Sequence, residues 1–207
     1  MGSYLSESMT RTRVAPREPA TLDPASVADF LGQLAAKAGA GLVLEPVGRS
    51  FLDRPIQAAT IGHGPQRVLA WSQMHGDEPT HTAVLLDLLT WLAAVANGEA
   101  ADEDAAAILS GVTLSVVPLL NPDGAVLGRR ENAQGIDVNR DARRLASPEG
   151  RMLRAAVERF RPDFAFNLHN QNARSTVGRS KRPSVVALMA PPLDFGCPET
   201  EQIVRAK

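Results

Sequence analysis

Apolar runs suited to buried strands alternate with segments of helical periodicity along this chain. Residues 67–72 form one such run, and leucines at helical spacing follow over Thr80–Ala96. A strand rich in β-branched residues is expected over residues 112–119, a capped helix from Ser147, and another strand over Phe164–Leu168. This alternation predicts an α/β domain with a mixed, mostly parallel central sheet flanked by helices.

Further elements are expected on either side of this alternation. A capping residue, a proline and apolar spacing predict a helix over residues 23–38. Residues 42–44 and Pro55–Ile61 are expected to be strands in a hairpin-like start to the sheet. Near the carboxyl end, residues 184–189 predict a buried strand and residues 198–201 the start of a helix.

Length and charge restrict the class of protein. With 207 residues the chain suits one sizeable domain, which we place at residues 21–207 after a flexible polar arm at residues 1–20. The 22 basic and 23 acidic residues leave no electrostatic footprint for nucleic acid or an anionic membrane. No apolar run approaches the roughly 20 residues of a spanning helix. We therefore expect a cytoplasmic protein that binds its partners in a pocket.

Potential metal ligands follow two of the predicted strands. His75 and Glu78 come after the strand at residues 67–72, and a helix or turn at that point would direct both side chains to one spot. His169 ends the strand at Phe164–Leu168. Because ligand sites in such sheets gather at the carboxyl ends of strands, we expect the three side chains to share one rim. Two histidines and one carboxylate form a catalytic zinc set with an open fourth position.

A long polar stretch at residues 125–144 is expected to be a loop that serves the site. Arg129 or Arg130 can donate to the carbonyl oxygen of an amide under attack. Arg140, beside Asn139, offers a planar fork that fits a carboxylate.

Other polar residues have different interpretations. Asp137 can orient a ligand histidine by accepting its second ring N–H. The Asn-Pro-Asp-Gly segment at residues 121–124 is a strong turn signal. His81 is interpreted as structural, and Glu149 and Glu158 as partners of nearby arginines on solvated faces.

Four segments occur in a characteristic order: His-Gly-Asp-Glu at 75–78, Asn-Pro-Asp-Gly at 121–124, Arg-Glu-Asn-Ala-Gln-Gly-Ile-Asp-Val-Asn-Arg at 130–140, and Phe-Asn-Leu-His at 166–169. This order resembles the zinc carboxypeptidases of the carboxypeptidase A type, the M14 metallopeptidases. The resemblance covers about half of the chain. It implies a zinc carboxypeptidase or phosphorylase/hydrolase-like fold with Zn²⁺ as cofactor.

The resemblance also implies roles for matching residues. The implied zinc ligands are His75, Glu78 and His169. Arg130 would polarise the carbonyl, because it stands five residues before Gly135, the spacing usual in the family. Asn139 and Arg140 would hold the terminal carboxylate of the substrate. Asp137 would be the partner of the first zinc-binding histidine.

Two features depart from the family pattern. Asp141 stands where the family usually has asparagine, and a carboxylate beside Arg140 is expected to weaken or redirect substrate choice. The family takes its general-base glutamate from well beyond the third zinc ligand, whereas 38 residues follow His169 here. Glu199 and Glu201 open a predicted helix instead of ending a strand. We therefore expect an amino-terminal portion of a larger enzyme, truncated at its carboxyl end and without the general base.

Three functional hypotheses follow. The leading one is a zinc-dependent metallocarboxypeptidase-like hydrolase, in which zinc-activated water attacks an amide next to a free terminal carboxylate. The second is a zinc deacylase of the succinylglutamate desuccinylase and aspartoacylase type, and the third is a non-catalytic zinc- and peptide-binding module. The substrate is thus a peptide or an acylated amino acid with a free carboxylate. A truncated sheet edge would also favour self-association.

Overall fold

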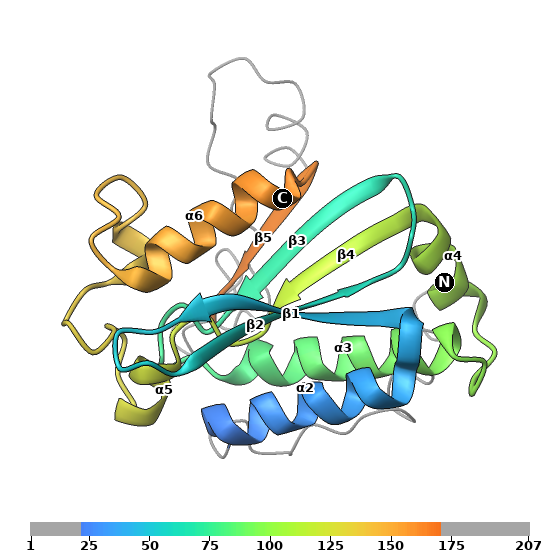
Figure 1. The fold of residues 1–207 in the computed structure, drawn as a ribbon, viewed down its shortest axis with the longest axis horizontal. Coiled ribbons are helices and arrows are strands. Elements are labelled where there is room, and N and C mark those ends of the chain that lie inside the picture. The colour runs from blue at the N-terminus through green and yellow to red at the C-terminus, as the bar shows by residue number, and fades with distance from the viewer. Residues whose placement is uncertain (1–21, 171–207) are drawn as a thin grey trace, which may run out of the picture. The chain divides into compact units, whose positions relative to one another are not determined.

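The computed structural model describes residues 22–170, which form a mixed sheet with helices on both faces (Figure 1). The strands are β1 (Leu42–Arg49), β2 (Pro55–Ile61), β3 (Gln66–Ser72), β4 (Val112–Val117) and β5 (Phe164–Leu168). Their order across the sheet is β1-β2-β4-β3-β5. The pairs β1/β2 and β2/β4 are antiparallel, whereas β3 runs parallel to both β4 and β5. The predicted α/β class with a mixed sheet is confirmed.

Parallel pairing places the ends of the central strands at one edge. The pairs Ser72↔Leu168 and Trp71↔Val117 show that β3, β4 and β5 end side by side. The segments that follow these strands therefore start from neighbouring points. This edge is where the sequence led us to expect the site.

The helices largely match the periodicity of the sequence. They are α2 (Pro24–Ala38), α3 (Thr80–Ala96), α4 (Glu103–Gly111), α5 (Pro122–Leu127) and α6 (Pro148–Phe160), with single 3-10 turns η2 (Gly39–Gly41) and η3 (Val138–Arg140). The Asp23 side chain accepts hydrogen bonds from the backbone N–H groups of Ala25 and Ser26, which caps α2. The Ser147 side chain caps α6 in the same way through Gly150 N–H.

Two hydrophobic clusters hold the sheet between its helices. The larger cluster joins α2, α3 and α4 to the sheet and includes Ala59 and Ile61. The smaller cluster includes Ile56 and Ala58, with Met152 of α6 packed against it. Odd and even residues of β2 thus face opposite clusters, as the alternation of a strand requires. In Figure 1, α2 and α3 lie on one side of the sheet and α6 lies on the other.

Residues 121–124 begin a helix, so the prediction of a simple turn was wrong. The Asn121 side chain accepts a hydrogen bond from Gly124 N–H at 2.9 Å, and Pro122 occupies the first helical position. Together, α5 and η3 also order parts of the stretch predicted as a loop. Helices of one or two turns are too short to leave a sustained apolar period in the sequence.

Some predictions fall elsewhere in the chain. The arm at residues 1–20, the strand at residues 184–189 and the helix at residues 198–201 lie outside the described residues. In the described part β5 pairs with β3 alone, and its side chains Phe164 and Phe166 are about half exposed. Self-association through this edge stays a prediction. None of the described helices has the length and apolar character needed to cross a membrane.

Candidate active site

A tight turn between β3 and α3 carries the first two potential metal ligands. His75 and Glu78 lie in this turn, before the helix begins, and Glu78 N–H donates to the His75 carbonyl at 3.1 Å. Gln73 starts the turn with a φ of 48°. Its buried side chain donates to the Gly76 carbonyl at 2.8 Å and accepts from the Thr82 hydroxyl at 2.6 Å. These bonds hold a conformation that costs a non-glycine residue about 1–3 kcal/mol.

Gly76 brings this turn into contact with α5. A Cβ atom on Gly76 would lie 2.0 Å from the carbonyl carbon of Gly124, so any other residue would collide with the backbone there. Gly76 N–H also lies 3.4 Å from the Arg130 carbonyl oxygen, at the long end for a hydrogen bond. The segments at residues 75–78 and 121–124 are therefore adjacent, because their backbones are in contact at Gly76 and Gly124.

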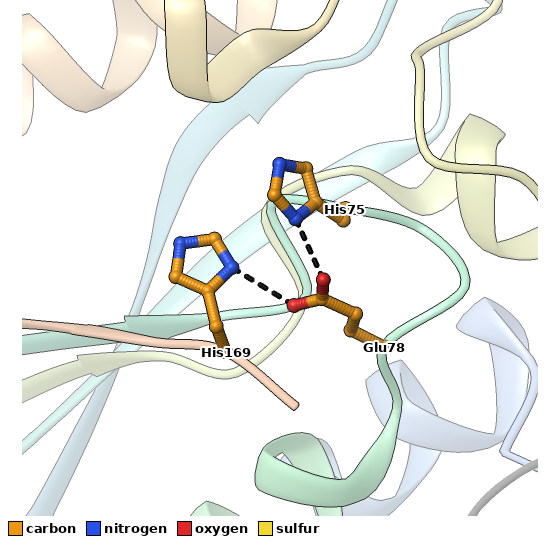
Figure 2. Close-up of side chains that lie close together, drawn as sticks. All are labelled: His75, Glu78 and His169. Atoms are coloured by element: carbon orange, nitrogen blue, oxygen red, sulfur yellow. Dashed lines mark hydrogen bonds and ion pairs between the residues drawn. The ribbon is translucent and has the colours of Figure 1, made fainter. Parts of the chain in front are cut away.

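Three side chains converge at the ends of β3 and β5. Glu78 bridges two imidazoles, with Oε1 at 2.8 Å from His75 Nδ1 and Oε2 at 2.8 Å from His169 Nδ1 (Figure 2). One ligand atom from each residue lies within 4.8 Å of the others. Asn170 N–H donates to Glu78 Oε2 at 3.1 Å and helps to fix the carboxylate. The predicted ligand set is thus brought together.

The electrostatics of this cluster suit a metal ligand. Burial raises the pKa of Glu78, but hydrogen bonds from His169 and His75 and the charge of His75 outweigh it and lower the pKa to about 2. Glu78 is consequently a carboxylate at neutral pH. Two imidazole nitrogens and a carboxylate oxygen are the donors of many catalytic zinc sites, so these residues fit Zn²⁺.

Asp137 and Arg130 adjoin the candidate metal ligands. Asp137 Oδ1 lies 3.3 Å from His75 Nε2, although the alignment is not that of a hydrogen bond. Arg130 Nε donates to Asp137 Oδ2 at 2.9 Å, and its Nη1 lies 3.2 Å from His75 Nδ1. Burial raises the pKa of Asp137, but the hydrogen bond from Arg130 and the charge of Arg130 outweigh burial and lower the pKa below its ordinary value. Arg129 instead donates to the Asn132 carbonyl.

The predicted carboxylate-binding pair, Asn139 and Arg140, lies within η3. Asn139 N–H donates to Asp137 Oδ1 at 2.9 Å, and Asn139 Oδ1 accepts from Asn167 of β5 at 3.2 Å. Arg140 is exposed and lines a hollow whose wall also includes Asp137. Asn139 is therefore tied to the strand that leads to His169, while the Arg140 side chain is available to a ligand.

Comparison with known proteins decides the family. The pattern of the family described as zinc carboxypeptidase (Peptidase_M14) matches residues 27–190. The chain belongs to the zinc carboxypeptidase family. The fold and the ordered motifs are consistent with that membership.

Individual relatives match this member of the zinc carboxypeptidase family over part of its length. Carboxypeptidase SOL1 of Arabidopsis thaliana is 33% identical over 104 residues, which are 47% of this chain and 21% of SOL1. A metallo-carboxypeptidase structure from Burkholderia cenocepacia has 28% identity and a TM-score of 0.61, covering 71% of this chain and 40% of that one. Carboxypeptidase A from Helicoverpa armigera shares the fold at 18% identity and a TM-score of 0.61, covering 73% and 46%. The match thus spans about a fifth of SOL1 and less than half of either structure.

A buried polar network organises the loop between Arg130 and Asp137. The Asn132 side chain accepts from the backbone N–H groups of Gln134 and Ile136, both at 3.0 Å, and donates to Glu149 at 2.8 Å. Asn132 and Glu149 have no exposed surface. Glu149 was expected to pair with surface arginines, which is wrong: its other oxygen accepts from a backbone N–H of the loop after β1. A glutamate in the first turn of a helix gives no sequence signal of burial.

Asp141 also has a structural role that the sequence did not reveal. Its carboxylate accepts from Ser147 N–H at 2.8 Å, the Ser147 hydroxyl at 2.6 Å and Ala146 N–H at 2.9 Å. Burial raises the pKa of Asp141, but these hydrogen bonds outweigh it and lower the pKa below its ordinary value of 3.8. The carboxylate is 3% exposed and closes the loop before α6, so its hydrogen-bonding capacity is largely used within the protein.

His81, interpreted as structural, borders the metal centre. It lies in the first turn of α3, three residues after Glu78. Burial lowers the pKa of His81, and the neighbouring Asn170 side chain and the charge of Glu78 only partly oppose this effect. The helical spacing of Glu78 and His81 was the available signal of this proximity.

Proposed function

We propose that this chain provides the zinc-binding and carboxylate-binding part of a metallocarboxypeptidase, a hydrolase that removes the terminal residue of a peptide with a free carboxylate. The observation that supports it most is the convergence of His75, Glu78 and His169 within 4.8 Å beside the Arg130–Asp137 pair. Family membership supports the same class of chemistry. The activity of any longer protein is part of this proposal.

His75, Glu78 and His169 would hold the metal ion. When bound there, zinc would polarise a carbonyl group and lower the pKa of its water to about 7. Asp137, 3.3 Å from His75 Nε2, keeps the imidazole oriented with its Nδ1 toward the site.

Arginines would supply the remaining contacts to the substrate. Arg130 has its Nη1 beside the metal ligands, where a guanidinium N–H can donate to the carbonyl oxygen as negative charge develops on it. Asn139 and Arg140 would take the terminal carboxylate, for which a guanidinium fork has matching geometry. The Asn139 contact to β5 fixes the distance between this recognition point and His169.

Hydrolysis of blocked dipeptides by the zinc-loaded chain tests the proposal. We expect slow release of the terminal amino acid, about 10²–10⁴-fold below a complete active site, because no general base is assigned among residues 22–170. An amidated peptide, which lacks the terminal carboxylate, is the matched control and should not be cleaved. Cleavage of N-acyl amino acids alone would indicate the deacylase instead, and zinc-dependent peptide binding without turnover would indicate the binding module.

A further inference from the structure

A hollow whose wall includes Asp137, the neighbour of His75, also contains two arginines in its wall. Arg140 and Arg144 line it together with Asp137 and Asp141, and both arginines are exposed. Arg140 was already expected to bind a carboxylate, whereas Arg144 was interpreted as part of a solvated face. Their position in one wall gives the hollow two guanidinium groups.

The two carboxylates of the wall already have partners. Asp137 accepts a hydrogen bond from Arg130, a cation outside this wall. Asp141 accepts three hydrogen bonds from Ala146 and Ser147, and the charge of Arg151 stabilises its ionised form.

The two arginines of the wall, by contrast, form no ion pair within residues 22–170. Arg140 donates to the Asn139 carbonyl at 3.4 Å, a long hydrogen bond that a ligand can replace. Because hydrogen bonds from Arg130, Ala146 and Ser147 already engage both carboxylates, the two guanidinium groups of the wall are left without a carboxylate partner among residues 22–170.

We propose that Arg144 binds a second carboxylate of the substrate, so that the site favours peptides whose terminal residue is aspartate or glutamate. The inference rests on the proposed function, in which Arg140 takes the terminal α-carboxylate. An acidic terminal residue carries two carboxylates on one short unit, which matches two guanidinium groups in one hollow. Charge-assisted hydrogen bonds of this kind favour the acidic peptide over its amide by about 10- to 100-fold.

Binding of N-acetylated dipeptides to the zinc-loaded chain tests this inference by isothermal titration calorimetry. The peptides end in glutamate or in glutamine, which has nearly the same shape without the second charge. We expect the glutamate peptide to bind about 10- to 100-fold more tightly. Arg144→Gln should remove the difference and leave glutamine-peptide affinity unchanged. Arg143→Gln is the matched control, since Arg143 is also exposed but lies outside the wall, and it should retain the difference.

Two results overturn the inference and separate it from the proposed function. Equal affinity for both peptides, or a preference that persists in Arg144→Gln, would exclude a role of Arg144 while leaving carboxylate binding intact. An amidated dipeptide tests the underlying proposal. If it binds as tightly as the peptide with a free terminal carboxylate, the proposed function itself fails.

Discussion

The metal centre and the arginine-bearing loop are held in place by different means. His75 and His169 follow the ends of two paired strands, and Glu78 lies between them with two hydrogen bonds of 2.8 Å. The Arg130 side chain is 40% exposed, and its loop depends on the buried Asn132–Glu149 hydrogen bond. The geometry of the proposed metal centre thus comes from the sheet, whereas that of the proposed substrate contacts comes from polar bonds within a loop.

Several contacts connect these regions, including the 3.2 Å approach of Arg130 Nη1 to His75 Nδ1. Gly76 packs against the backbone of Gly124, and Asp137 lies between His75 and Arg130. If the regions are otherwise independent, a change in the loop should alter turnover, substrate binding or stability. The affinity of the metal centre for zinc should stay the same. The predictions below test that separation, beginning with the largest effect.

Arg130→Ala should reduce turnover by about 10²–10³-fold, because it removes a donor to the charge that develops on the carbonyl oxygen. Zinc content should stay the same, since the three ligands and Asp137 remain. Steady-state hydrolysis of a blocked dipeptide and zinc analysis of the same sample measure both effects. Loss of zinc together with activity would show that the two regions are not separable.

Asn132→Ala should lower the free energy of unfolding by about 2–3 kcal/mol. The change removes the donor to the buried Glu149 and the acceptor for two backbone N–H groups. Urea denaturation measures it, and Gln134→Ala in the same turn is the control because Gln134 is exposed. Zinc affinity should be retained in both variants, while the Michaelis constant should rise in Asn132→Ala. An equal loss of stability in both variants would contradict a specific stabilising role of the Asn132 hydrogen bonds.

Asp141→Asn should lower stability by about 2 kcal/mol near neutral pH, since hydrogen bonds to a charged acceptor are the stronger ones. The pKa of Asp141 is lower in the folded protein than its ordinary value of 3.8, so its contribution is complete above about pH 4. That contribution disappears as pH falls through the lowered pKa. The difference between wild type and variant should therefore shrink below pH 4, as thermal unfolding between pH 2.5 and 7 can measure.

Asp29→Asn is the control for this pH series, because Asp29 is exposed and has no such set of hydrogen bonds in the described part of the chain. It should follow the wild-type curve within about 0.5 kcal/mol. A constant difference between wild type and Asp141→Asn across the whole pH range would show that the charge of Asp141 does not contribute.

Much of the fold was predictable because most of its helices and strands are long enough to show a regular spacing of apolar residues. Thr80–Ala96 has four buried leucines, and Asp23 and Ser147 carry capping signals that the structure reproduces. The six-residue α5 was missed, since one and a half turns show no period. Strand pairing order could not be predicted, because it depends on contacts between distant segments.

The candidate ligands of the site were predictable from the sequence, whereas the residues that hold them and the neighbouring loop in place were not. Motif order located His75, Glu78 and His169, and the structure brings them together. Gln73, with a left-handed backbone, and Glu149, buried beside Asn132, have no local signature in the sequence. Both act through bonds to segments that only the folded chain brings near.

The central claim is that His75, Glu78 and His169 form one zinc site. Zinc content after loading and exhaustive dialysis, measured by mass spectrometry on wild type and His169→Ala, tests it most directly, with circular dichroism as the check on folding. We expect one tightly bound zinc per wild-type chain and a loss of tight binding in the folded variant. A wild-type chain without zinc, or a variant that retains it fully, would contradict the account.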